Sequence, residues 1–338
     1  MLIRFPNERL DVGLGLALIR KRNAKLYTVL QLYHCARYGE LAKLDLEQEL
    51  DFSDQTYKFE AYNYQTRANL LLGKYKEALA KIEESKKIIP SFTEQSEASF
   101  LQSELESLIK YAAFLENGDS EDIASYFTRT DLPGGLSSLL SSCYFAKKGD
   151  LEAAFKRLHP KEDLENVEFG CYLLLLLSKT TDAQRFLDDH VTNDSASDTV
   201  GYNQTEAWIQ LEGYGDELNR AYYHFDDLAG SGNTTSLKLL VCVLVSHLKL
   251  HHMPEAEETL SRIVSYRADH RDEEAAELGN WAVDLLVDEI ALRRIQSRNS
   301  DADALFNKLK AEHPDSAYVK DVQAKQDAFD DIVAKYAA

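Results

Sequence analysis

The sequence predicts an all-α protein whose helices stack as an α-α superhelix of about eight helical hairpins. The 338 residues contain only 6 Pro and 15 Gly, so few residues interrupt the apolar periodicity of the helices. Five of the prolines fall where one helical pattern stops and another begins: Pro90, Pro133, Pro160, Pro254 and Pro314. A long all-helical chain without one large core is typically a solenoid, so repeats are expected along it.

The clearest repeat unit lies between residues 62 and 90. Its defining residues are Tyr62, Thr66, Gly73, Tyr75, Ala78, Ile82 and Pro90. Their spacing resembles that of the tetratricopeptide repeat, a pair of antiparallel helices about 34 residues long. Gly73 allows the chain to reverse after the first helix, Ala78 lets the two helices cross closely, and Pro90 ends the second helix.

The step from a small alanine to a bulky apolar residue four positions later recurs along the chain. It occurs at Ala154/Leu158, Ala183/Leu187, Ala221/Phe225, Ala256/Leu260 and Ala302/Phe306. Weaker pairs cover residues 26–50, turning at Gly39, and residues 98–129, turning at Asn117 and Gly118. These repeats predict a tetratricopeptide-like helical array over residues 27–314.

The two ends of the chain differ from this array. Residues 1–26 show no repeat and are interpreted as an N-terminal extension or flexible tail. Residues 315–338 are predicted to form a capping helix over the open end of the array, because their apolar residues recur at helical spacing. These apolar residues are Tyr318, Val322, Phe329, Ile332, Val333 and Tyr336.

The charge balance restricts the class of partner. The chain has 38 Lys+Arg against 57 Asp+Glu, a formal net charge of −19, whereas nucleic acid and anionic lipid both attract clustered cations. The longest apolar runs, residues 171–177 and 239–245, are far shorter than the roughly 20 residues of a membrane span. The four cysteines are scattered and form no CxxC pair, which indicates reduced thiols in the cytoplasm. The composition predicts a cytoplasmic protein that binds other proteins.

No set of residues predicts catalysis, a cofactor or a metal. The glycine pair Gly134 and Gly135 is not followed by the Lys-Ser/Thr of a phosphate-binding loop. His247 and His251 share a helix face, but Glu255 lies beyond Pro254, and one helix supplies too few ligands. We therefore expect a non-enzymatic protein.

The inner, concave face of the array is the expected binding surface. Aligning the repeats places nine residues there: Asn63, Arg67, Leu139, Cys143, Tyr172, Leu175, Val241, Val245 and Leu248. Apart from Glu168 and the early repeat, this face is largely apolar, and Arg67 alone cannot clamp a terminal carboxylate. Two interpretations remain open. The face either binds an apolar protein segment, or the superhelix closes and buries these residues itself.

Two stretches resemble a known family. Residues 207–211 (AWIQL) are followed by a glycine-containing insertion at 212–217 and then by AYYHF at 221–225. The C-terminus combines His313-Pro314 with YVK at 318–320, Ala324-Lys325, Phe329-Asp330 and Tyr336. Together they resemble the epsilon subunit family of coatomer, epsilon-COP, over residues 27–338, whereas residues 1–26 have no counterpart.

The resemblance implies a structural subunit of the coatomer (COPI) coat in Golgi-to-ER retrograde and intra-Golgi transport. Its partners would be the C-terminal region of the alpha subunit, which the superhelix wraps and stabilises, and other coatomer subunits. It would be cytoplasmic and peripheral on Golgi membranes and COPI-coated vesicles, associating with membrane indirectly through the coat. The alternative is a generic tetratricopeptide adaptor of another cytosolic complex, although such an adaptor has no reason to share the insertion and the closing helix.

Overall fold

A computed structural model describes residues 24–49, 55–92, 94–160, 163–191, 199–230, 235–270 and 281–336. These residues form 18 α-helices, one short 3-10 helix and no strand. The prediction of an all-α helical-repeat superhelix is confirmed. Most of the predicted N-terminal extension, residues 1–26, lies outside the described residues.

The helices follow one another with short connections. The first half contains α1 (Ala24–His34), α2 (Tyr38–Lys43), α3 (Leu46–Glu49), α4 (Gln55–Leu71), α5 (Tyr75–Ile88), η1 (Ile89–Ser91), α6 (Gln95–Asn117), α7 (Glu121–Thr128), α8 (Leu136–Lys147) and α9 (Leu151–Lys156). The second half contains α10 (Leu164–Leu176), α11 (Thr180–His190), α13 (Val200–Leu211), α14 (Asp216–Gly230), α15 (Leu237–Leu250), α16 (Met253–Asp269), α18 (Ala282–Ile295), α19 (Asn299–Glu312) and α20 (Ala317–Tyr336).

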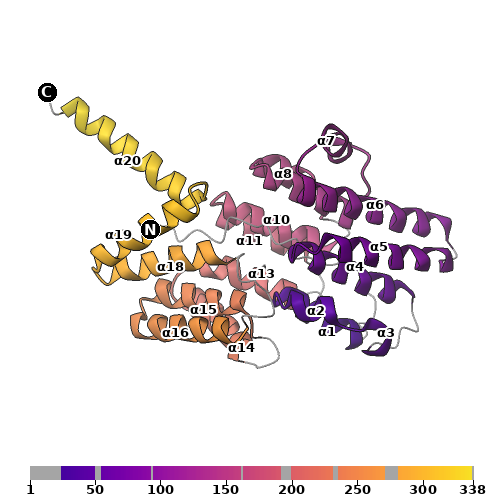
Figure 1. The fold of residues 1–338 in the computed structure, drawn as a ribbon, viewed down its shortest axis with the longest axis horizontal. Coiled ribbons are helices and arrows are strands. Elements are labelled where there is room, and N and C mark those ends of the chain that lie inside the picture. The colour runs from indigo at the N-terminus through magenta and orange to yellow at the C-terminus, as the bar shows by residue number, and fades with distance from the viewer. Residues whose placement is uncertain are drawn as a thin grey trace.

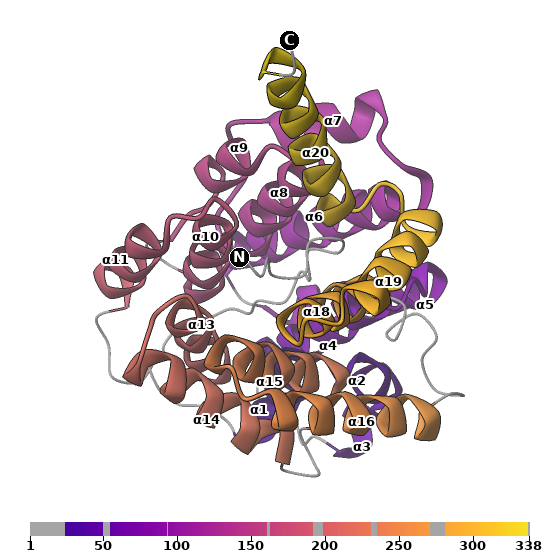
Figure 2. The same ribbon diagram turned by 90° about the vertical axis from the view of Figure 1, so that its left-hand side faces the viewer.

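Successive helices pack as antiparallel pairs that wind into a superhelix (Figure 1). Figure 2 shows α8, α10, α13 and α15 on the inside of the curve, with α9, α11, α14 and α16 outside them. The pairing therefore follows the order of the predicted hairpins.

The alanines of the repeat lie where the paired helices cross. Six of them are fully buried: Ala78, Ala154, Ala183, Ala221, Ala256 and Ala302. A larger side chain at these positions would push the two helix axes apart, because helix pairs approach to within about 8–10 Å. Their burial confirms the repeat assignment from the sequence.

The turns inside the hairpins use left-handed backbone conformations. Gly73 and Gly118 have φ of +71° and +84°, at the turns that the sequence predicts. Ser178 and Ser297 adopt the same left-handed region without being glycine, with φ of +59° and +61°. The predicted turn at Gly39 is wrong: α1 ends at His34, so the chain reverses before that glycine, which lies inside α2.

Two other predictions need correction. The insertion predicted at 212–217 is shorter than expected. Helix α14 already begins at Asp216, so only residues 212–215 lie between α13 and α14. The C-terminal helix α20 forms, but it covers the end of the array only through its first turns, where Val319 is buried. Its remaining turns project from the body (Figure 1), with Phe329 59% and Tyr336 85% exposed.

The superhelix closes on itself at its N-terminal end. The Lys238 ammonium, on α15, donates to the backbone carbonyl of His34 at 3.1 Å, a contact between residues 204 positions apart. Cys35 packs in the same hydrophobic cluster as Leu237 and Leu240 of α15. Helix α1 therefore lies against α13 and α15, which narrows the space inside the curve.

We predict that Gly73→Ala lowers the free energy of unfolding by about 1 kcal/mol. An added Cβ would meet no atom within 4 Å, so the cost comes from the left-handed backbone alone. Gly230→Ala is the matched control, because its Cβ also meets nothing and its φ lies outside the left-handed region. Urea denaturation should show no loss of stability for this control, and equal effects of the two substitutions would contradict the explanation.

Candidate partner-binding surface

The structure places the nine predicted residues on four of the inner helices. Asn63 and Arg67 lie on α4, Leu139 and Cys143 on α8, Tyr172 and Leu175 on α10, and Val241, Val245 and Leu248 on α15. All of them except Tyr172 and Val245 are buried within the chain.

Seven of the nine residues therefore present no open surface in the isolated chain. The buried apolar residues among them pack in the hydrophobic clusters that join neighbouring repeats. This burial agrees with the second of the two interpretations left open by the sequence, in which the superhelix buries these residues itself. Partner binding by these residues stays a prediction.

Four half-buried apolar residues of α10, α13 and α15 define what we call the inner strip: Tyr172, Trp208, Cys242 and Val245. The rings of Tyr172 and Trp208 lie 6.0 Å apart and link α10 to α13. Trp208, Cys242 and Val245 all pack against one hydrophobic cluster, which links α13 to α15. At this inner strip a partner could contact the predicted concave face while the helices stay folded.

A buried ion pair connects two distant repeats. The Arg67 guanidinium on α4 donates to the Glu165 carboxylate on α10 at 2.9 Å and 3.3 Å, with the side chains only 3% and 1% exposed. The guanidinium also lies over the rings of Tyr33 and Tyr64, at 4.8 Å and 5.0 Å. Arg67 thus has its charge satisfied inside the chain and is not available to bind a partner's carboxylate.

Several polar groups beside this pair have no hydrogen-bond partner. Both side-chain amide atoms of Asn63 and of Gln204 are buried and unpartnered, as is one carboxylate oxygen of Glu168. Glu168 presses against Gly201 of α13, where an added Cβ would lie 2.4 Å from its carboxylate. Burial raises the pKa of Glu168 well above its ordinary value. The interior therefore contains buried polar groups among its apolar residues.

Three residues of this interior were not anticipated from the sequence: Glu165, Gln204 and Lys238. The Lys238 ammonium lies 5.0 Å from the Trp208 ring centre, beside the inner strip. Gln204 lies on α13, a helix from which the repeat alignment placed no residue on the concave face. The sign of these residues in the sequence is a polar residue on the apolar face of an inner helix. Such a residue marks a position of interest, but the sequence does not say which group it contacts.

Two further carboxyls in the first half of the array are held in an apolar environment. Burial raises the pKa of Glu104 to about 8, although the Leu136 amide donates to its carboxylate at 3.1 Å. Burial also raises the pKa of Asp163 to about 7, against the hydrogen bond from the Asn166 amide. Near neutral pH, both groups hold protons that the unfolded chain would release.

The described residues contain no group of three His, Cys, Asp or Glu side chains that could hold a metal ion. Among the helices of the described ranges, none is both long enough and apolar enough to cross a membrane.

The fold defines a tetratricopeptide-like helical-repeat protein, a class whose curved inner surface is used to bind extended partners. A family model of the coatomer epsilon subunit matches residues 22–337. The chain belongs to the coatomer epsilon subunit family, which confirms the resemblance seen in its sequence. It is accordingly a structural coat subunit that interacts with other coatomer subunits.

We predict that Arg67→Met lowers the free energy of unfolding by about 3–5 kcal/mol, because it leaves the Glu165 carboxylate buried without a counter-charge. Replacing both partners, in Arg67→Met with Glu165→Leu, should recover most of this loss, since neither charge is then buried. Urea denaturation of the two variants at pH 7 measures both effects. A loss below about 1 kcal/mol for the single variant would mean that water reaches the pair.

We predict that Glu104 makes the stability depend on pH. Its pKa of about 8 in the folded chain lies above the ordinary value of 4.5, so its contribution is complete below pH 4.5 and is lost as the pH rises to about 8. The slope should be up to about 1.4 kcal/mol per pH unit. Glu104→Gln should remove this slope in chemical denaturation at pH 5, 6.5 and 8.

The control for this experiment is Glu106→Gln, two residues further along α6, where the side chain is exposed. It should leave the pH profile of the wild type unchanged. A Glu104→Gln profile parallel to the wild type would show that the buried carboxyl does not hold its proton.

Proposed function

We propose that this protein is the coatomer subunit that binds and stabilises the C-terminal region of the alpha subunit. The segment of the alpha subunit would lie against the inner strip. In this role the protein acts in Golgi-to-ER retrograde transport and intra-Golgi transport. The coat carries it to Golgi membranes and COPI vesicles from the cytoplasm.

The match to the coatomer epsilon subunit family over residues 22–337 carries this proposal. The inner strip supports it, because aromatic and aliphatic side chains that are only half-buried favour a further apolar contact. Indirect membrane association agrees with the net charge of −19, which disfavours direct contact with anionic lipid.

We predict that Val245→Asp weakens binding to the C-terminal region of the alpha coat subunit by about 2–5 kcal/mol, because it places a charge in a desolvated contact. Co-purification and titration calorimetry with that region measure the loss. Val264→Asp introduces the same charge on the outer helix α16, where the valine is 65% exposed, and should bind like the wild type.

Circular dichroism must show that both variants remain helical. If Val245→Asp is folded and still binds the alpha region with wild-type affinity, the inner strip is not the contact surface.

A further inference from the structure

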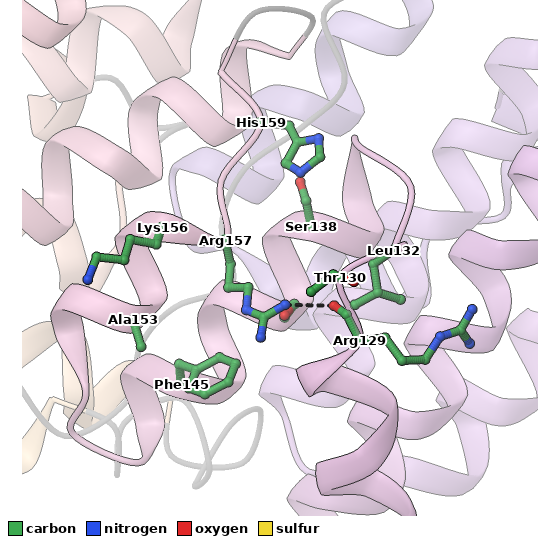
Figure 3. A pocket seen from close by; sticks show the side chains of 10 residues that line it. Arg129, Thr130, Leu132, Ser138, Phe145, Ala153, Lys156, Arg157 and His159 are labelled. Carbon is green, nitrogen blue, oxygen red and sulfur yellow. Dashed lines mark hydrogen bonds between the residues drawn. The ribbon is translucent and has the colours of Figure 1, made fainter.

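A cavity of about 430 Å³ lies between the segment that follows α7, helix α8 and helix α9. All its lining residues fall between positions 129 and 159, so none of the helices that carry the inner strip contributes to it. Figure 3 shows Phe145, Ala153 and Leu132 along its wall, with Arg157 between them and Lys156 at its edge. The cavity is thus separate from the surface proposed to bind the alpha subunit.

The charge of this cavity is opposite to that of the chain. Its lining includes Arg129, Lys156, Arg157 and His159, and no aspartate or glutamate. The whole sequence has 57 acidic residues and a net charge of −19, so a lining free of carboxylates is a departure from its composition. A concave site with cations and no counter-charges in its wall attracts an anionic group.

Arg157 is held in a fixed position inside the cavity. Its guanidinium donates to the carbonyl oxygens of Thr128 and Arg129, at 3.0 Å and 2.6 Å, and lies 5.0 Å from the centre of the Phe145 ring. Two carbonyls and a ring face position the group without neutralising its charge. Arg129, by contrast, is paired with Asp131 at 3.0 Å and contributes little net charge.

Lys156 supplies the second charge. Its side chain is exposed at the end of α9, and no ion pair to it occurs among the described residues. An ammonium on a flexible stem can move toward an anion that Arg157 already holds. The Phe145 ring lies beside the Arg157 guanidinium, which suits a ligand that carries an apolar group next to its anion.

We propose that this cavity binds a short acidic peptide segment of a second partner protein. A carboxylate or phosphate of the segment accepts hydrogen bonds from Lys156 and Arg157, while a neighbouring apolar side chain packs on Phe145. The protein then has two contact surfaces, an inner one for the alpha subunit and this basic cavity for an acidic segment.

The test uses the full chain and a fluorescent peptide of four glutamates around a central phenylalanine. Fluorescence anisotropy should show binding of this peptide and at least about tenfold weaker binding of the same peptide with glutamines. Lys156→Glu should weaken binding of the acidic peptide about tenfold as well. Lys76→Glu, an exposed position on α5, changes the net charge equally and should bind like the wild type.

A third peptide, with phosphoserine in place of two glutamates, distinguishes the two sources of the anion. Tighter binding of this peptide identifies a phosphorylated segment as the ligand, and equal or weaker binding identifies carboxylates. Equal binding of the glutamate and glutamine peptides would overturn the proposal. So would equal weakening by Lys156→Glu and Lys76→Glu, because only the net charge of the chain would then matter.

Discussion

The close crossing of two helices in every hairpin is the constraint on which the rest of the structure depends. In six of the hairpins a fully buried alanine at the crossing lets the two backbones approach, and this distance sets how each pair stacks on the next. Because each repeat contacts mainly its neighbours, small rotations between pairs add up along the chain. Their sum brings Lys238 onto the His34 carbonyl across 204 residues. The contacts inside the superhelix are consequences of local packing repeated many times.

The dependence of the fold on local helix crossings explains which features the sequence could predict. The spacing around Gly73 and Ala78 is local, and it was sufficient for the fold class, the order of the hairpins and several turns. The left-handed turns at Ser178 and Ser297 were missed, because serine carries no signal for a conformation that the flanking helices impose. Burial of the concave residues depends on how tightly the array winds, and a repeat alignment contains no measure of that winding.

Polar groups buried inside the superhelix lower the stability of the isolated chain and restrict which groups can pack beside them. The Arg67–Glu165 pair loses the solvation of two charges, so it contributes little net stability while remaining costly to break. Asn63 and Gln204 keep amide groups without partners, which is unfavourable in the isolated chain. In the proposed role, binding of the alpha subunit to the folded chain would offset part of this cost.

The acidic character of the chain determines which segments the basic cavity can accept. At physiological salt, exposed charges interact over only about 8 Å, so the surface carboxylates repel an acidic protein mainly at close approach. A broad acidic surface would face many of these carboxylates, which the two cations Lys156 and Arg157 cannot offset. A narrow extended segment can lie against Phe145 and reach Arg157 and Lys156 while little of it faces carboxylates elsewhere on the chain. The contrast between the cavity and the rest of the chain thus favours a short linear segment over a folded acidic domain.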